Sequence, residues 1–75
     1  MKHPITGEHT FGATVRRLRR QRGLSMEAVA RDAGITFVSV HKIETGKSKG
    51  SPESRQRIAR ALGVDLDTIL ALVAN

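Results

Sequence analysis

Residues 26–45 read MEAVARDAGITFVSVHKIET, and this stretch predicts two short helices joined by a tight turn at Gly34. Glycine adopts the positive φ that a chain reversal within a few residues needs. Ala30 is small enough for two helices to approach closely, and Val40 and Ile43 are spaced to bury one face of the second helix. The stretch therefore predicts a helix-turn-helix whose second helix keeps its other face exposed.

Three more helices are predicted outside this stretch. The first begins after Thr10, a common N-cap residue, and ends near Gly23. The tripeptide Ser-Pro-Glu at residues 51–53 starts another helix, which ends at Gly63, and a last helix follows Asp65. Because no stretch has the pattern of a strand, the predicted fold class is all-α, a compact domain of five helices.

The N-terminal residues 1–9 contain Pro4 and Gly7 and lack apolar periodicity, so we expect a flexible N-terminal arm there. Residues 10–75 then form one domain, with the helix-turn-helix at about residues 26–45. A chain this short buries a modest core. We therefore expect idealised helix packing or a partner chain to stabilise it.

The charge balance of the chain favours a polyanionic partner. Thirteen Lys and Arg oppose seven Asp and Glu, which gives a net charge of +6. Such a charge promotes binding to nucleic acid through the release of counterions. With two Phe and no Tyr or Trp, the chain lacks the aromatic platforms on which single-stranded bases stack.

The sequence lacks the groups that catalysis requires. It has no Cys and no metal-binding motif, and its His residues lie in the expected arm (His3, His9) and on a helix face (His41). We expect no enzyme activity, cofactor, metal or small-molecule ligand. No apolar run approaches the ~20 residues of a membrane span, and no signal peptide is recognisable, so we expect no membrane association and a cytoplasmic, nucleoid-associated protein.

The central stretch resembles the Cro and phage-repressor (XRE-like) helix-turn-helix family of transcriptional regulators. The residues that carry the resemblance are Gly23-Leu24-Ser25, Ala30, Gly34, Val40, Ile43-Glu44 and Gly46. Residues 57–70, RIARALGVDLDTIL, are similar to the closing segment of the same family. The resemblance covers about residues 10–72 and implies a lambda-repressor-like DNA-binding domain with its helix-turn-helix at helices two and three.

In this family the second helix of the motif lies in the major groove of DNA. The resemblance therefore implies a base-reading face formed by Thr36, Phe37, Val38, Ser39, His41 and Lys42. Phe37 and Val38 have no hydrogen-bonding side-chain atoms, so they can only make apolar contact with thymine methyl groups; the alternative is that Phe37 folds back onto the core or the fourth helix. We expect the site to be read mainly through shape and methyl groups.

Contacts to the DNA backbone are expected beside this face. Residues 46–51 form a flexible polar loop that directly follows the third helix. The amide groups at the start of the second helix can also receive a phosphate. The residues expected at the DNA backbone are Ser25, Met26, Lys47, Ser48, Lys49, Arg16 and Arg20.

Two positions depart from the family pattern. The family commonly places Gln at the first residue of helix two and near the start of helix three, where this sequence has Met26 and Phe37. The polar clamp that those glutamines provide is missing. DNA binding stays the leading interpretation, but base-specific recognition is weakened and adaptation of this face to a protein partner becomes the alternative.

Two structural roles complete the prediction. The resemblance implies an ion pair between Arg19 and Glu44 that ties the third helix to the first. The last helix is more apolar than a short surface helix needs. We therefore predict a dimer face formed by Ile69, Leu70, Leu72 and Val73, and the alternative is that the whole face completes a monomeric core.

The combined prediction is a sequence-specific transcriptional regulator that binds double-stranded DNA as a homodimer, either as a repressor or as an operon controller. Many members of the family that it resembles are repressors, and some small ones control restriction–modification or toxin–antitoxin operons. The alternative is a helix-turn-helix-derived protein-interaction module, an antitoxin-like inhibitor or a regulatory subunit, that uses Phe37 and Val38 as an apolar patch.

Overall fold

The structure is a computed structural model that describes residues 10–74. Within that range it contains only helices and no strand, as the all-α prediction requires. The helices are α1 (Phe11–Gln21), α2 (Met26–Ala33), α3 (Phe37–Glu44), α4 (Pro52–Leu62) and α5 (Leu66–Ala74). The predicted N-terminal arm, residues 1–9, lies outside the described residues.

Hydroxyl side chains start four of the helices. In each case the side-chain oxygen of the residue before the helix accepts a hydrogen bond from the backbone N–H three residues later, which satisfies one of the free donors of the first turn. Removing such a cap costs about 1 kcal/mol. The capping pairs are Thr10 with Ala13, Ser25 with Ala28, Thr36 with Ser39, and Ser51 with Ser54.

The turn between α2 and α3 rests on Gly34. Its φ of 72° and ψ of 30° lie in the left-handed region, which costs other residues about 1–2 kcal/mol. The N–H of Ile35 donates to the carbonyl of Ala30 at 3.0 Å and closes the end of α2. This short closure leaves only three residues, 34–36, between α2 and α3.

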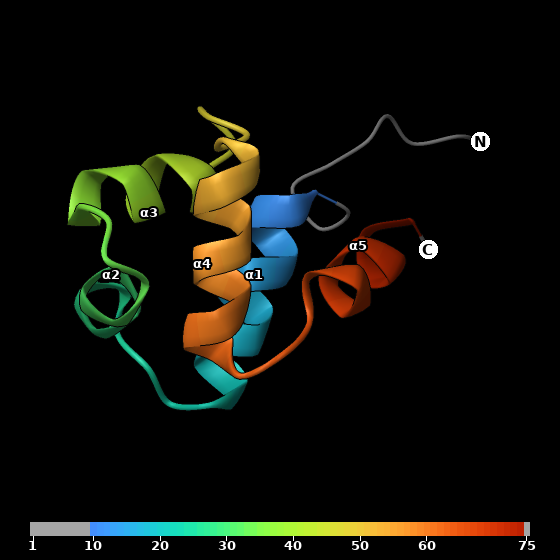
Figure 1. The fold of residues 1–75 in the computed structure, drawn as a ribbon, viewed down its shortest axis with the longest axis horizontal. Helices are drawn as coiled ribbons and strands as arrows, with labels where there is room; N and C mark the ends of the chain where they lie inside the picture. The colour runs from blue at the N-terminus through green and yellow to red at the C-terminus, as the bar shows by residue number, and fades with distance from the viewer. Residues whose placement is uncertain (1–9, 75) are drawn as a thin grey trace.

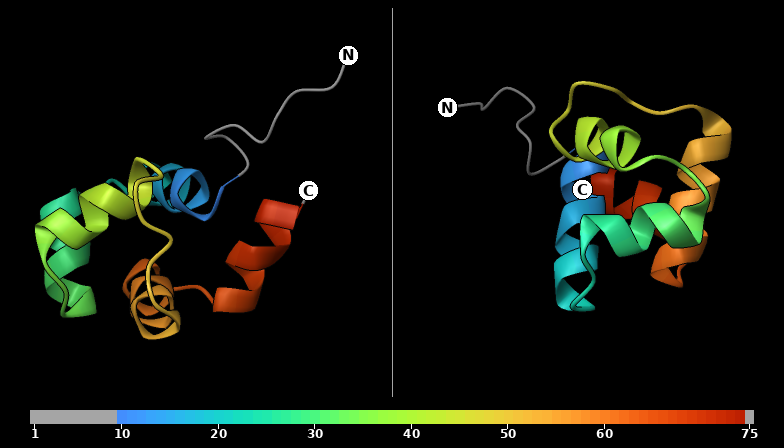
Figure 2. Two further views of the ribbon diagram at one scale, coloured as in Figure 1. Left: turned by 90° about the horizontal axis from the view of Figure 1, so that it is seen from above. Right: turned by 90° about the vertical axis from the view of Figure 1, so that its left-hand side faces the viewer.

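The helices are arranged around a central pair. α1 and α4 lie side by side, α2 and α3 pack on one side of them, and α5 packs on the other (Figure 1). The view from above shows the same separation of α5 from α3 (Figure 2). The helix-turn-helix and the last helix therefore present separate surfaces.

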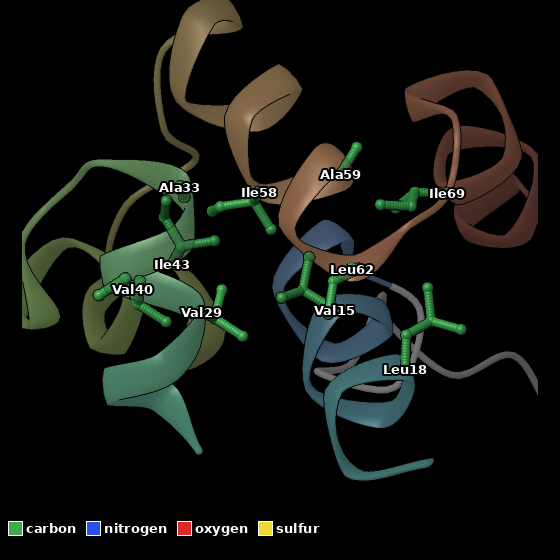
Figure 3. Packing of buried hydrophobic residues seen from close by; sticks show 11 residues of the cluster. Val15, Leu18, Val29, Ala33, Val40, Ile43, Ile58, Ala59, Leu62 and Ile69 are labelled. Carbon is green, nitrogen blue, oxygen red and sulfur yellow. The ribbon is translucent and has the colours of Figure 1, made fainter. Parts of the chain in front are cut away.

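The core joins all five helices through apolar side chains that meet between them (Figure 3). Its residues are Val15, Leu18, Val29, Ala30, Ala33, Val40, Ile43, Ile58, Ala59, Leu62 and Ile69. The predicted inward positions of the helix-turn-helix, Ala30, Val40 and Ile43, are all buried. The small Ala30 and Ala33 let α2 lie close to its neighbours.

The placement of Ile69 in a dimer face was wrong. Its side chain is 0 % exposed and points from α5 toward Ala59 and Leu62 of α4 (Figure 3). Val73 is half-buried and packs against the same core. Leu70 and Leu72 remain 40 % and 39 % exposed, so only part of the predicted face is available to a partner.

Candidate nucleic-acid interface

The outward face of α3 is apolar at its start and basic further along. Phe37 and His41 are one turn apart, and so are Val38 and Lys42, so these four side chains form one continuous surface. All four are exposed, with Phe37 at 41 % and Val38 at 56 %. The core residues of α3 lie on its opposite side, which fixes this face toward the outside.

Phe37 does not fold back onto the core. Its ring stacks on the ring of His41, with centroids 6.1 Å apart and an interplanar angle of 29°. Aromatic pairs at this separation gain stability beyond the area they bury. The stack holds Phe37 on the outer surface of α3, where it can contact a ligand.

The hydroxyls at the start of α3 bond to each other. Thr36 Oγ1 accepts from the backbone N–H of Ser39 at 3.0 Å and donates to Ser39 Oγ at 2.9 Å. Ser39 is also half-buried. These two residues of the predicted face are therefore engaged in capping α3, and they offer less hydrogen-bonding capacity outward than the sequence suggested.

An ion pair fastens the far end of α3 to α1. Arg19 Nε donates to Glu44 Oε2 at 2.7 Å and Arg19 Nη2 donates to Glu44 Oε1 at 3.0 Å. Arg19 Nη1 also donates to the carbonyl of Leu24 at 2.8 Å. The hydrogen bond to Glu44 raises the pKa of the Arg19 guanidinium above its ordinary value, so Arg19 stays charged at any physiological pH.

Gly12 is a second link between α1 and α3, and the sequence analysis missed it. A Cβ built on Gly12 would overlap the carbonyl oxygen of Ile43 and would lie 3.1 Å from the Cα of Glu44. The two helix backbones therefore touch at this point. The available signal was a glycine inside an otherwise helical pattern, which often marks close backbone approach.

The sequence suggested a flexible loop after α3. In the structure, hydrogen bonds tie this loop to its neighbours. The N–H groups of Lys47 and Ser48 donate to the carbonyl of Lys42 at 2.9 and 3.2 Å. The N–H of Gly50 donates to Ser48 Oγ at 3.1 Å. Lys47, Ser48 and Lys49 are all exposed, so the structure presents two cations on an ordered loop beside α3.

Arg55 of α4 braces this loop. Its Nε donates to the carbonyl of Lys49 at 2.9 Å, and its guanidinium lies 5.4 Å from the centroid of the Phe11 ring. The cation–π contact joins the loop to the start of α1. Periodicity along α4 could not reveal these partners of Arg55, because they belong to a loop and to another helix.

Replacing Arg55 by Met is expected to loosen the loop while the fold persists. Methionine has no hydrogen-bond donor and no charge, so the substitution removes both the bond to Lys49 and the cation over Phe11. The amide order parameters of residues 47–50 should then fall from ~0.85 to below ~0.6 in NMR relaxation measurements. Arg60→Met is the control, because Arg60 is exposed at the other end of α4. Unchanged order parameters in Arg55→Met would show that the loop does not need this brace.

The remaining predicted backbone residues lie around the same region. Arg16 is one helical turn from both Gly12 and Arg19, the α1 residues that contact α3, so it occupies the adjoining flank of α1. Arg20 follows one turn later, and both are exposed. At the start of α2, Ser25 uses its hydroxyl as a cap and Met26 packs against the core, which leaves their backbone N–H groups for an anion.

The part of the chain that the structure describes contains no group of three or more His, Cys, Asp or Glu side chains that could hold a metal ion. In the same range, none of the helices is long and apolar enough to cross a membrane.

The fold and this site define a protein class. Two short helices joined by a glycine turn, with the second helix exposed and a basic loop after it, form an XRE-like helix-turn-helix domain. A family model described as a helix-turn-helix domain matches residues 10–72, and the chain belongs to that family.

Two solved structures have the same fold. The restriction-modification controller protein C.AhdI from Aeromonas hydrophila is 30% identical in sequence, with a TM-score of 0.76 over 79% of this chain and 89% of that one. The clp gene regulator ClgR from C. glutamicum is 24% identical, with a TM-score of 0.82 over 96% of this chain and 92% of that one. A comparison with curated protein sequences finds no significant match. The family and the controller structure support a DNA-binding transcriptional regulator.

Proposed function

We propose that this protein is a sequence-specific regulator of transcription that inserts α3 into the major groove of double-stranded DNA. One observation carries the proposal: a rigidly held α3 presents Phe37, Val38, His41 and Lys42 outward, and an ordered basic loop lies beside it. Helices held in this way dock their exposed N-terminal turn against base edges. The Arg19–Glu44 pair and the Gly12 contact hold that docking face in place.

Phosphate contacts in this proposal come from groups on both sides of α3. Lys47, Ser48 and Lys49 follow it directly, and Arg16 and Arg20 lie on the adjoining flank of α1. The free N–H groups at the start of α2 add the positive end of a helix dipole, with Ser25 and Met26 at that end. The net charge of +6 favours the same polyanion.

The proposal includes a homodimer that acts as a repressor or operon controller. Leu70 and Leu72 are exposed on α5, which packs on the side of the α1–α4 pair away from α3 (Figure 1). A two-fold contact through α5 would leave both copies of α3 free to reach DNA. A controlling role agrees with that of C.AhdI, which is a restriction-modification controller protein.

Selection of bound sequences from a random duplex pool tests these points together. We expect enrichment of one motif with two-fold symmetry and half-sites about one helical turn apart. Enrichment of single half-sites alone would contradict the dimer but not DNA reading. Failure to bind any duplex at low salt would contradict the whole proposal and would favour the alternative, a protein-interaction module that uses Phe37 and Val38 as its contact patch.

Changing Lys47 and Lys49 to Gln should weaken binding to every duplex alike. Each lost phosphate contact should reduce the slope of log K against log salt by about 0.9. Arg60→Gln removes one charge at the far end of α4 and should leave the salt slope unchanged. If the slope depended only on net charge, Arg60→Gln would change it as much as the loss of one of the two lysines does. Binding isotherms on the selected duplex and on a scrambled one, at several salt concentrations, give both quantities.

A further inference from the structure

We propose that the first turn of α3 reads the C5-methyl group of pyrimidines, on thymine or on 5-methylcytosine, and that it reads the methyl group rather than the base. This inference rests on the proposed function, because it names the chemical group that the same face selects. It follows from what the exposed surface of α3 contains and from how its side chains are held.

The start of α3 has few polar side chains. Thr36 and Ser39 hydrogen-bond to each other as part of the helix cap. Phe37 and Val38, which are exposed between them, have no side-chain donor or acceptor. This turn therefore lacks the bidentate Arg, Asn or Gln groups that distinguish bases by hydrogen bonding.

The apolar side chains of Phe37 and Val38 match an apolar group of the major groove. In the major groove the C5-methyl group of thymine is the apolar feature of a base pair, and cytosine acquires the same feature only when it is methylated. Val38 presents branched methyl groups at 56 % exposure, and Phe37 presents a ring at 41 % exposure. A methyl group that leaves water against these two side chains gains the ordinary stabilisation of apolar burial.

Phe37 is held in place within this patch. The ring of Phe37 is held against His41 by stacking, and α3 itself is anchored at its other end through Glu44. The stack leaves Phe37 less side-chain freedom to lose on binding, so its apolar contact is converted more fully into affinity. His41 is in this sense a positioning residue for Phe37. The basic charge of the adjacent loop makes duplex DNA the occupant that fits this patch.

Four duplexes that differ at one thymine position of the selected motif test the inference. The position holds thymine, deoxyuridine, 5-methylcytosine paired with guanine, or cytosine paired with guanine. We expect thymine and 5-methylcytosine to bind with similar affinity. We expect deoxyuridine and cytosine to bind about threefold to fivefold more weakly for each methyl group lost at a contacted position. Equal binding of thymine and deoxyuridine at every position of the motif would overturn the inference while leaving DNA binding intact.

Variants then assign the effect to side chains. Val38→Thr replaces one methyl group by a hydroxyl of similar size on an exposed position, so the fold should persist while the preference for the methylated pyrimidines decreases. Phe37→Ala should decrease it as well. Lys49→Gln is the matched control, because it should weaken all four duplexes and keep their ratios. If both Phe37→Ala and Val38→Thr kept the full preference, the methyl group would act through DNA shape and the inference would be wrong. If the unaltered protein bound none of the four duplexes, the proposed function itself would be refuted.

Discussion

Replacing Gly12 by alanine is expected to destabilise the fold by about 3 kcal/mol or more. Local helix propensity would predict the opposite, a gain in stability. Gly12 lies inside α1, and alanine in a helix interior is favoured over glycine by about 1 kcal/mol. The added Cβ would overlap the carbonyl oxygen of Ile43, so α1 and α3 must separate along their shared backbone contact.

Thermal and urea unfolding measure this effect directly. A loss of about 3 kcal/mol in a domain of this size lowers the melting temperature by about 12–24 °C. The proposed DNA-docking face of α3 should be disturbed too, because Gly12 contacts the part of α3 that adjoins Glu44. In the fraction that stays folded, we expect weaker discrimination between the selected duplex and a scrambled one.

Gly23→Ala is the matched control for this prediction. Gly23 has a φ of 66°, and a Cβ added there would meet no neighbouring atom within 4 Å. Its replacement therefore costs only the left-handed backbone conformation, about 1–2 kcal/mol. A larger loss in Gly12→Ala than in Gly23→Ala identifies the close helix contact as the cause. If Gly12→Ala is as stable as the parent or more stable, helix propensity outweighs packing here and the contact is not essential.

Replacing Glu44 by alanine is expected to destabilise the fold by about 3–5 kcal/mol. The side chains of Arg19 and Glu44 are only 11 % and 4 % exposed. Removing the carboxylate leaves the Arg19 guanidinium largely buried, with the carbonyl of Leu24 as its remaining partner. An uncompensated buried charge accounts for most of the expected loss, which urea unfolding of the variant would measure.

The chain offers a matched exposed pair. Glu53 accepts hydrogen bonds from Arg57 one turn later in α4, and the side chains are 74 % and 45 % exposed. Glu53→Ala should therefore cost less than about 1 kcal/mol. In the double variant Arg19→Met/Glu44→Ala, the loss should be smaller than the sum of the two single losses, because the second change removes the unpaired charge. Additive losses would contradict the ion-pair interpretation.

Sequence reasoning was most successful where structure depends on near neighbours. The caps at Thr10, Ser25, Thr36 and Ser51 and the turn at Gly34 each involve groups within about one helical turn of one another. Such hydrogen bonds and φ preferences can be read from the residue types and their spacing. The resemblance to a known family added the long-range Arg19–Glu44 pair, which spacing alone could not have supplied.

The errors lie where the answer depends on a distant segment. Ile69 and Leu70 are adjacent and both apolar, yet Ile69 is fully buried and points toward Ala59 and Leu62, whereas Leu70 is 40 % exposed. The loop after α3 reads as polar and glycine-rich, but Arg55 and the carbonyl of Lys42 hold it in place. Neither outcome can be derived from the residues of the segment itself, because the partner belongs to another element.

Local hydrogen bonding and side-chain chemistry were enough to predict the helices, their ends, the reversal at Gly34 and the apolar character of the exposed turn of α3. Three features depend instead on how the elements pack: α1 and α3 touch at Gly12, Phe37 stacks on His41 away from the core, and the lysine loop is braced. The physical reason is that packing selects among side-chain and helix placements that are equally compatible with local preference. That selection is what turns an apolar pair of residues, Phe37 and Val38, into a positioned surface.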